Sequence, residues 1–138
     1  MSIPPRVMIV DDNESDVELL KAALEDLDQP ATLAIARNGA QAIAQIAACL
    51  VGHDHPRLVL LDLNMPAVSG HEVLAFIRSH AVLSDMRVVI LTTSMLPADR
   101  VRCMVAGAND YRVKPQRFAD YLVLIQSLFA THVEVDHA

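Results

Sequence analysis

Four predicted strands of this chain each end directly in residues with polar or charged side chains. Residues 7–10 precede Asp11 and Asp12, residues 58–61 precede Asp62, residues 88–91 precede Thr92, Thr93 and Ser94, and residues 110–113 precede Lys114. Short apolar runs separated by helical patterns are typical of buried parallel strands. Because the carboxyl ends of parallel strands meet at one edge of a sheet, we expect these side chains to form a single site.

Helical patterns alternate with the strands along the whole chain. They are predicted from about residue 13 to near Pro30, from Asn38 to Leu50, after Gly70, from Pro97 to about Gly107, and from Gln116 to Thr131, with a further strand at 32–36. Five strand–helix units predict a doubly wound α/β fold: a five-stranded parallel sheet in a three-layer, flavodoxin-like arrangement. Periodicity does not give the strand order. We expect one domain over residues 1–138, with a core of about 6–131 and short tails at 1–5 and 132–138.

Composition excludes several classes of protein. The formal charge of −6 and the absence of a Lys/Arg run argue against direct nucleic-acid binding. The first residues lack the basic and apolar parts of a signal peptide, and no apolar run reaches the ~20 residues that span a bilayer, so no membrane association is expected. Cys49 and Cys103 are interpreted as small apolar core residues of a protein in a reducing compartment. A cytoplasmic location is predicted.

The predicted site contains the groups needed for phosphoryl chemistry. Carboxylates of Asp11, Asp12 and Asp62 are the hard oxygen ligands that Mg²⁺ prefers. A carboxylate such as Asp62 can attack phosphorus and form an aspartyl phosphate, provided that positive charge and donors neutralise the phosphoryl oxygens. Lys114 and Thr92 are the natural cation and hydroxyl donor. Taken singly, Asp11-Asp12 also fits a helix-capping pair, Lys114 an ordinary turn residue and Thr92 an ordinary strand end. The placement of all of them at strand ends favours a phosphoacceptor site.

Together these segments resemble the receiver domain of bacterial two-component response regulators over essentially the full length of the chain. The resemblance is carried by Asp11-Asp12, the segment 62–66 with Gly70, Thr92, and the segment 108–111 running into Lys114-Pro115. It implies that Asp62 accepts phosphate from a sensor histidine kinase, and that Asp11, Asp12, Asp62 and the backbone carbonyl of Asn64 hold Mg²⁺. It also implies that Thr92 and Lys114 bind the phosphoryl group and that Tyr111 changes rotamer on activation. Thr93 is included with Thr92 among the candidate phosphoryl-binding residues. It stands where the family usually has alanine, and the spacing favours Thr92 as the inward hydroxyl.

The implied function is a phosphorylation-gated module that changes partner binding or dimerisation at the surface formed by the last two helices and the strand between them. The alternative is a phosphorelay intermediate that passes phosphate to a histidine phosphotransfer protein. No further enzymatic activity is expected beyond self-catalysed phosphorylation and dephosphorylation. A dehalogenase-type hydrolase is disfavoured because Asn64 occupies the position of its general acid, and a nucleotide-binding protein because no strand precedes a glycine-rich loop. No output domain follows Phe129, so a DNA-binding regulator is not expected.

Three further features of the sequence lead to predictions. The long connection 47–56 and the ending past Phe129 resemble those of small receivers paired with phytochrome-type kinases. His53-Asp54-His55 contains potential metal ligands, but a solvated loop is the favoured interpretation. In the last helix, Val123 and Leu124 make residues 121–125 continuously apolar, which predicts a second packing surface and a homodimer.

Overall fold

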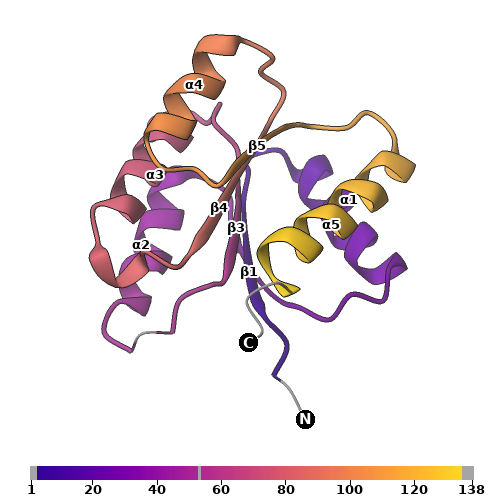
Figure 1. The fold of residues 1–138 in the computed structure, drawn as a ribbon, viewed down its shortest axis with the longest axis horizontal. Helices are drawn as coiled ribbons and strands as arrows, with labels where there is room; N and C mark the ends of the chain where they lie inside the picture. Colours follow the sequence, from indigo (N-terminus) through magenta and orange to yellow (C-terminus); the bar gives the residue numbers. More distant parts are fainter. Residues whose placement is uncertain (1–2, 53, 135–138) are drawn as a thin grey trace.

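The computed structural model describes residues 3–52 and 54–134, which form one sheet with helices on both faces (Figure 1). The strands are β1 (Arg6–Val10), β2 (Thr32–Ala36), β3 (Leu58–Leu61), β4 (Arg87–Thr92) and β5 (Asp110–Val113). All neighbouring strands are parallel, and their spatial order is β2-β1-β3-β4-β5. Since the order turns back between β1 and β3, the sheet is doubly wound, and the predicted fold class is confirmed.

The helices of the described residues lie in two layers. They are α1 (Glu14–Asp26), α2 (Gly39–Cys49), α3 (Gly70–Arg78), α4 (Pro97–Val105) and α5 (Phe118–His132), with a short 3₁₀ turn at Ala81–Leu83. Helices α1 and α5 cover one face of the sheet, and α2, α3 and α4 lie on the other (Figure 1). Each face has its own apolar core, and all four residues of the central strand β3 are buried between the two cores. A strand buried on both faces reads as a continuous apolar run, as observed.

Capping side chains determine where several helices begin. Asn13 accepts a hydrogen bond from the N–H of Asp16 at the start of α1, and Asn38 occupies the same position before α2. Ser69 and Glu72 form a reciprocal capping box at the start of α3. These contacts satisfy N–H groups that have no partner within the helix, so they place each helix start just beyond the loop that follows the preceding strand.

Several predicted boundaries and exposures were wrong. Helix α1 ends at Asp26 rather than near Pro30, because Asp28 adopts the left-handed conformation with φ of 53°. Helix α5 runs from Phe118 to His132, against a predicted range of Gln116 to Thr131. Val133, which was assigned to the tail, is buried. Leu124, expected to face solvent, is also buried, because α5 packs against both the sheet and α1 and so buries a wide arc; Val123 remains exposed.

The two cysteines differ in burial. Cys103 is buried as expected, but Cys49 is only partly buried. Within the described ranges, no helix is long and apolar enough to cross a bilayer.

Candidate functional site

The acidic residues come together because β1 and β3 are neighbours in the sheet. Val10 pairs with Leu61, and the N–H of Asp62 donates to the carbonyl of Val10 at 2.9 Å. Asp11 and Asp62 follow these strands directly and are both buried, whereas Asp12 is exposed at the rim. One carboxylate oxygen from each of the three residues lies within 4.8 Å of the others. The structure therefore brings together the three carboxylates expected at this edge.

This cluster has the chemistry of a divalent-cation site. All three side chains offer hard oxygen donors, which suit Mg²⁺ or Mn²⁺. Burial raises the pKa of Asp11, although Lys114 and the N–H of Asn13 both favour its ionised form. A buried carboxylate that is disfavoured as an anion gains from added positive charge, so the residues present fit such an ion.

Lys114 reaches the acidic cluster from the far side of β4. The N–H of Lys114 donates to the carbonyl of Thr92 at 2.7 Å, which fixes the end of β5 beside β4. Its Nζ lies 2.8 Å from Oδ2 of Asp11 and 3.6 Å from Oδ2 of Asp62. Burial disfavours the ammonium, but the surrounding carboxylates outweigh this and raise the pKa of Lys114 well above its usual range. The lysine is therefore a permanent cation beside Asp62.

Asp16 is a member of this cluster that the sequence reasoning missed. It lies in the first turn of α1, and its Oδ2 is 2.7 Å from Nζ of Lys114. An acid in the first turn of a helix ordinarily needs no explanation beyond the helix dipole. The available signal was its position four residues after Asp12, which places it one helical turn beyond the acidic pair.

The two threonines at the end of β4 differ in burial. Thr92 is fully buried, and its Oγ1 accepts hydrogen bonds from the N–H of Ser94 at 3.3 Å and from Nδ2 of Asn64 at 3.5 Å. Thr93 is exposed. Successive residues of a strand alternate between faces, so only one of the two can turn inward, and it is Thr92. Thr93, included among the candidate phosphoryl-binding residues, has an exposed side chain, and its role stays a prediction.

Tyr111 on β5 is buried and joined to the same loop. Its hydroxyl donates to the carbonyl of Ser94 at 3.0 Å, and the guanidinium of Arg100 lies 5.9 Å from its ring centroid. The hydroxyl of Ser94 in turn donates to Oδ2 of Asp99 at 2.6 Å. Ser94 thus contacts Thr92 through its N–H and Tyr111 through its carbonyl, which links the two predicted switch residues by one residue of backbone.

The segment 53–55 does not form a second cluster. His53 lies outside the described residues. Asp54 pairs with Arg6, while Nε2 of His55 contacts Oδ1 of Asp85 at 2.8 Å. Among the residues that the structure describes, the group of Asp11, Asp12 and Asp62 is the one set of three potential ligands close enough to share a metal ion.

Taken together, these contacts describe a site suited to anionic phosphorus chemistry. Asp62 offers a buried carboxylate at the edge of the sheet where the strands end. Lys114 supplies a fixed positive charge, Thr92 a hydroxyl group, and the acidic cluster a place for a divalent ion. Positioning and neutralisation of charge are the two requirements of phosphoryl transfer, and both are present here.

Comparisons with known proteins agree with this architecture. The family model described as response regulator receiver domain matches residues 7–126. The chain is 33% identical over 130 residues to response regulator Rcp1 of Synechocystis, covering 92% of this chain and 88% of Rcp1. It is 36% identical over 115 residues to the probable methanogenesis regulatory protein FilR2 of Methanothrix harundinacea, covering 83% and 74% of the two chains.

Solved structures give the same result. The phosphorylated cyanobacterial phytochrome response regulator RcpA matches with a TM-score of 0.87 and 27% identity over 96% of each chain. The Mn²⁺-bound form of Rcp1 matches with a TM-score of 0.81 and 28% identity, covering 98% of this chain and 97% of that one.

Proposed function

The chain belongs to the response regulator receiver domain family of two-component signalling, and on this premise we propose that it is a switch controlled by phosphorylation of Asp62. The observation that carries the proposal is the arrangement around this side chain. Its carboxylate shares a cluster with Asp11 and Asp12 and lies 3.6 Å from the ammonium of Lys114. A buried acid that combines a cation with a divalent-ion site is what an aspartyl phosphate requires.

The proposed reaction is a transfer from a phosphohistidine of a sensor kinase. An oxygen of Asp62 forms a bond to phosphorus while the bond from phosphorus to the imidazole nitrogen breaks, and the departing imidazole keeps the electron pair. Lys114 binds one phosphoryl oxygen and the hydroxyl of Thr92 another, which holds the group in place. When bound, Mg²⁺ supplies further positive charge to the phosphoryl oxygens. Asp11, Asp12, Asp62 and the carbonyl of Asn64 are the residues that would hold it, and the Mn²⁺-bound form of Rcp1 supports an ion of this class.

Phosphorylation would reach the surface through Ser94. A movement of Thr92 toward the phosphoryl group displaces Ser94, whose carbonyl binds the Tyr111 hydroxyl. Tyr111 belongs to the edge strand β5, which lies between helices α4 and α5 on opposite faces of the sheet. These three elements expose several apolar side chains. They are Val101, Val105, Val113, Phe118 and Val123. An exposed apolar face of this kind supports a partner or dimer surface whose affinity depends on Tyr111.

The partners follow from the same reasoning. A sensor histidine kinase is the proposed phosphate donor, and the likeness to RcpA, a phytochrome response regulator, supports a phytochrome-type kinase.

A second copy of the chain is the proposed occupant of the apolar face. Light scattering with and without phosphorylation tests this: Val105→Glu should weaken any dimer, because Val105 is 84% exposed within that face. A monomer under both conditions would contradict it.

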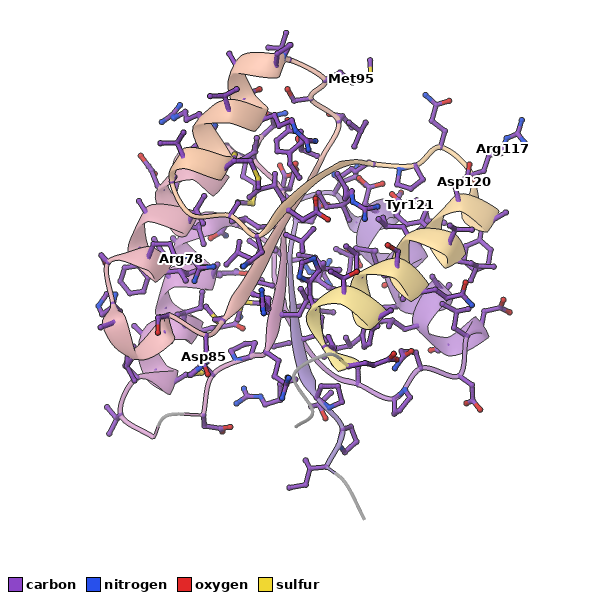
Figure 2. All side chains as sticks on the ribbon, in the orientation of Figure 1. Arg78, Asp85, Met95, Arg117, Asp120 and Tyr121 are labelled. Atoms are coloured by element: carbon purple, nitrogen blue, oxygen red, sulfur yellow. The ribbon has the colours of Figure 1, made fainter. Side chains whose placement is uncertain are left out.

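The central test is intact mass after incubation with acetyl phosphate and Mg²⁺. We expect one phosphoryl group per chain, absent in Asp62→Asn and absent in the presence of a chelator. Asp85→Asn is a matched control, because Asp85 is exposed and lies at the end of the sheet remote from Tyr121 (Figure 2). An adduct that persists in Asp62→Asn would refute the assignment of the phosphoacceptor.

A further inference from the structure

The ammonium of Lys114 lies closer to two other carboxylates than to the proposed phosphoacceptor. Its Nζ is 2.7 Å from Asp16 and 2.8 Å from Asp11, but 3.6 Å from Asp62. Both short distances are those of charge-assisted hydrogen bonds, whereas the distance to Asp62 is longer than such a bond. In the unphosphorylated protein, therefore, the lysine is held mainly by residues other than the one that it is proposed to serve.

Asp16 is built into this position. Its N–H donates to Oδ1 of the capping residue Asn13 at 3.1 Å, which fixes its backbone in the first turn of α1. Its side chain is 19% exposed, and it contacts a lysine side chain that is 6% exposed. Glu14, also in that first turn, is exposed and pairs with Arg37. A favourable interaction with the helix dipole accounts for an acid at either position, but it does not account for a carboxylate directed at a buried ammonium.

The same carboxylate lies near α5, because α1 packs against that helix. Tyr121 lies on the side of α5 that faces the sheet and is 1% exposed (Figure 2). Burial raises the pKa of Tyr121 to about 12, and the negative charge of nearby Asp16 adds to this rise. Since α1 and α5 pack side by side on one face of the sheet, Asp16 lies where it can touch both α5 and the end of β5.

We propose that Asp16 is a positioning residue that restrains Lys114 in the unphosphorylated protein and transmits phosphorylation to α5 through Tyr121. The proposal rests on the function proposed above. A phosphoryl group on Asp62 carries more negative charge than the carboxylate that it replaces, so it draws the ammonium away from Asp16. Asp16 then loses its cation in a largely buried place, so its negative charge acts more strongly on the nearby Tyr121 hydroxyl.

This path is separate from the one through Ser94. It begins at Lys114 rather than Thr92, and it passes through α1 to the inner side of α5 rather than through β5 to α4. The two paths use different side chains beyond the phosphorylation site, although the N–H of Lys114 is bonded to the carbonyl of Thr92. They can therefore be broken one at a time, and a substitution at Asp16 should leave the response of α4 intact.

The first experiment measures the position of Lys114 without any phosphodonor. The chain has two lysines, Lys21 and Lys114, so their ammonium and Cε signals are readily resolved by NMR after lysine labelling. Asp16→Asn should shift the Lys114 signal and leave Lys21 unchanged. Glu18→Gln is the control, because it also removes one negative charge from α1 and Glu18 lies 3.5 Å from Nζ of Lys21. It should shift the Lys21 signal and leave the Lys114 signal unchanged. An unchanged Lys114 signal in folded Asp16→Asn would overturn the proposal whatever the fate of Asp62.

The second experiment measures phosphorylation. Asp16→Asn should increase the rate of labelling by acetyl phosphate roughly three- to ten-fold, the range that one unit charge at a largely buried site produces. Glu18→Gln should label at the wild-type rate. A rate in Asp16→Asn that equals or falls below the wild-type rate would overturn the restraining role, because Lys114 would then not be held back from Asp62.

The third experiment follows α5 by hydrogen exchange. Phosphorylation should alter exchange in residues 121–125 of the wild-type protein, and this change should fall at least two-fold in both Asp16→Asn and Tyr121→Phe, while the response of α4 persists. An unaltered response of α5 in both variants would overturn the transmission through Tyr121. If wild-type protein forms no adduct on Asp62, the proposed function is refuted. The lysine NMR experiment still tests the contact between Asp16 and Lys114, because it uses no phosphodonor.

Discussion

Substitution of Gly70 by alanine should damage the phosphoacceptor site through the backbone of Asp62 itself. Gly70 is the first residue of α3 and is buried against the segment that follows β3. A Cβ atom at this position would lie 2.2 Å from the carbonyl oxygen of Asp62 and 2.8 Å from Cα of Leu63. Because non-bonded contacts begin at about 3.3 Å, the added methyl group requires a backbone movement of about 1 Å.

Two measurable consequences follow from this movement. Forcing a methyl group into a packed interior costs about 2–3 kcal/mol, so we expect the free energy of unfolding to fall by that amount. A displacement of about 1 Å in a reacting group can lower a rate roughly 100-fold, so labelling of Asp62 by acetyl phosphate should fall by this order. Phosphorylation is therefore expected to be affected more than fold stability, because the clash falls on the nucleophile's own residue.

Urea unfolding followed by circular dichroism measures the first effect, and intact mass against time measures the second. Gly52→Ala is the matched control, because a Cβ there meets its nearest atom at 3.9 Å, and we expect neutrality or a gain of up to about 1 kcal/mol. If Gly70→Ala unfolds within about 0.5 kcal/mol of Gly52→Ala and is labelled at the same rate, the steric reasoning is refuted.

Two further predictions concern charge. Lys114→Ala leaves Asp11 and Asp62 without their cation, so in a chelator it should lower the free energy of unfolding by about 3 kcal/mol. Adding Mg²⁺ should then stabilise this variant more than the wild-type protein. The same Mg²⁺-dependent gain in the free energy of unfolding for both proteins, measured by urea unfolding, would contradict this. Burial, reinforced by Arg87 and Arg112, lowers the pKa of His132, so the unfolded chain binds this proton more readily. The free energy of unfolding should therefore fall as the pH drops from about 7 toward the lowered pKa, by about 1.4 kcal/mol for each unit by which the pKa is lowered. In His132→Gln, the urea midpoint should depend less on pH.

The fold could be predicted largely because each strand carries its own local signal. The run 58–61 reads as a strand buried on both faces, and Asn13, Asn38 and Ser69 mark helix starts by their capping chemistry. Helix α5 was predicted less well. Its continuous apolar segment was interpreted as having an outward face at Val123 and Leu124, but packing against α1 buries Leu124. How wide an arc a helix buries depends on its neighbours, which a sequence pattern does not name.

The chemistry of the site was present in the sequence as a set of residue types at strand ends. Asp11, Asp62, Thr92 and Lys114 each follow a predicted strand directly, and parallel strands bring their carboxyl ends to one edge. These local signals predicted that Asp11, Asp12 and Asp62 come together, as the structure shows. They could do so because side-chain chemistry and strand position are properties of short segments.

Only the tertiary structure decided how the site's charges are shared. That Lys114 is bound more closely by Asp16 than by Asp62, and that the charge of Asp16 raises the pKa of Tyr121, depends on α1, β5 and α5 meeting at one place. Asp16 and Lys114 are 98 residues apart in the chain. Which of several carboxylates an ammonium binds is set by distances of a few tenths of an ångström and by burial, and these arise from the packing of whole elements rather than from any local pattern.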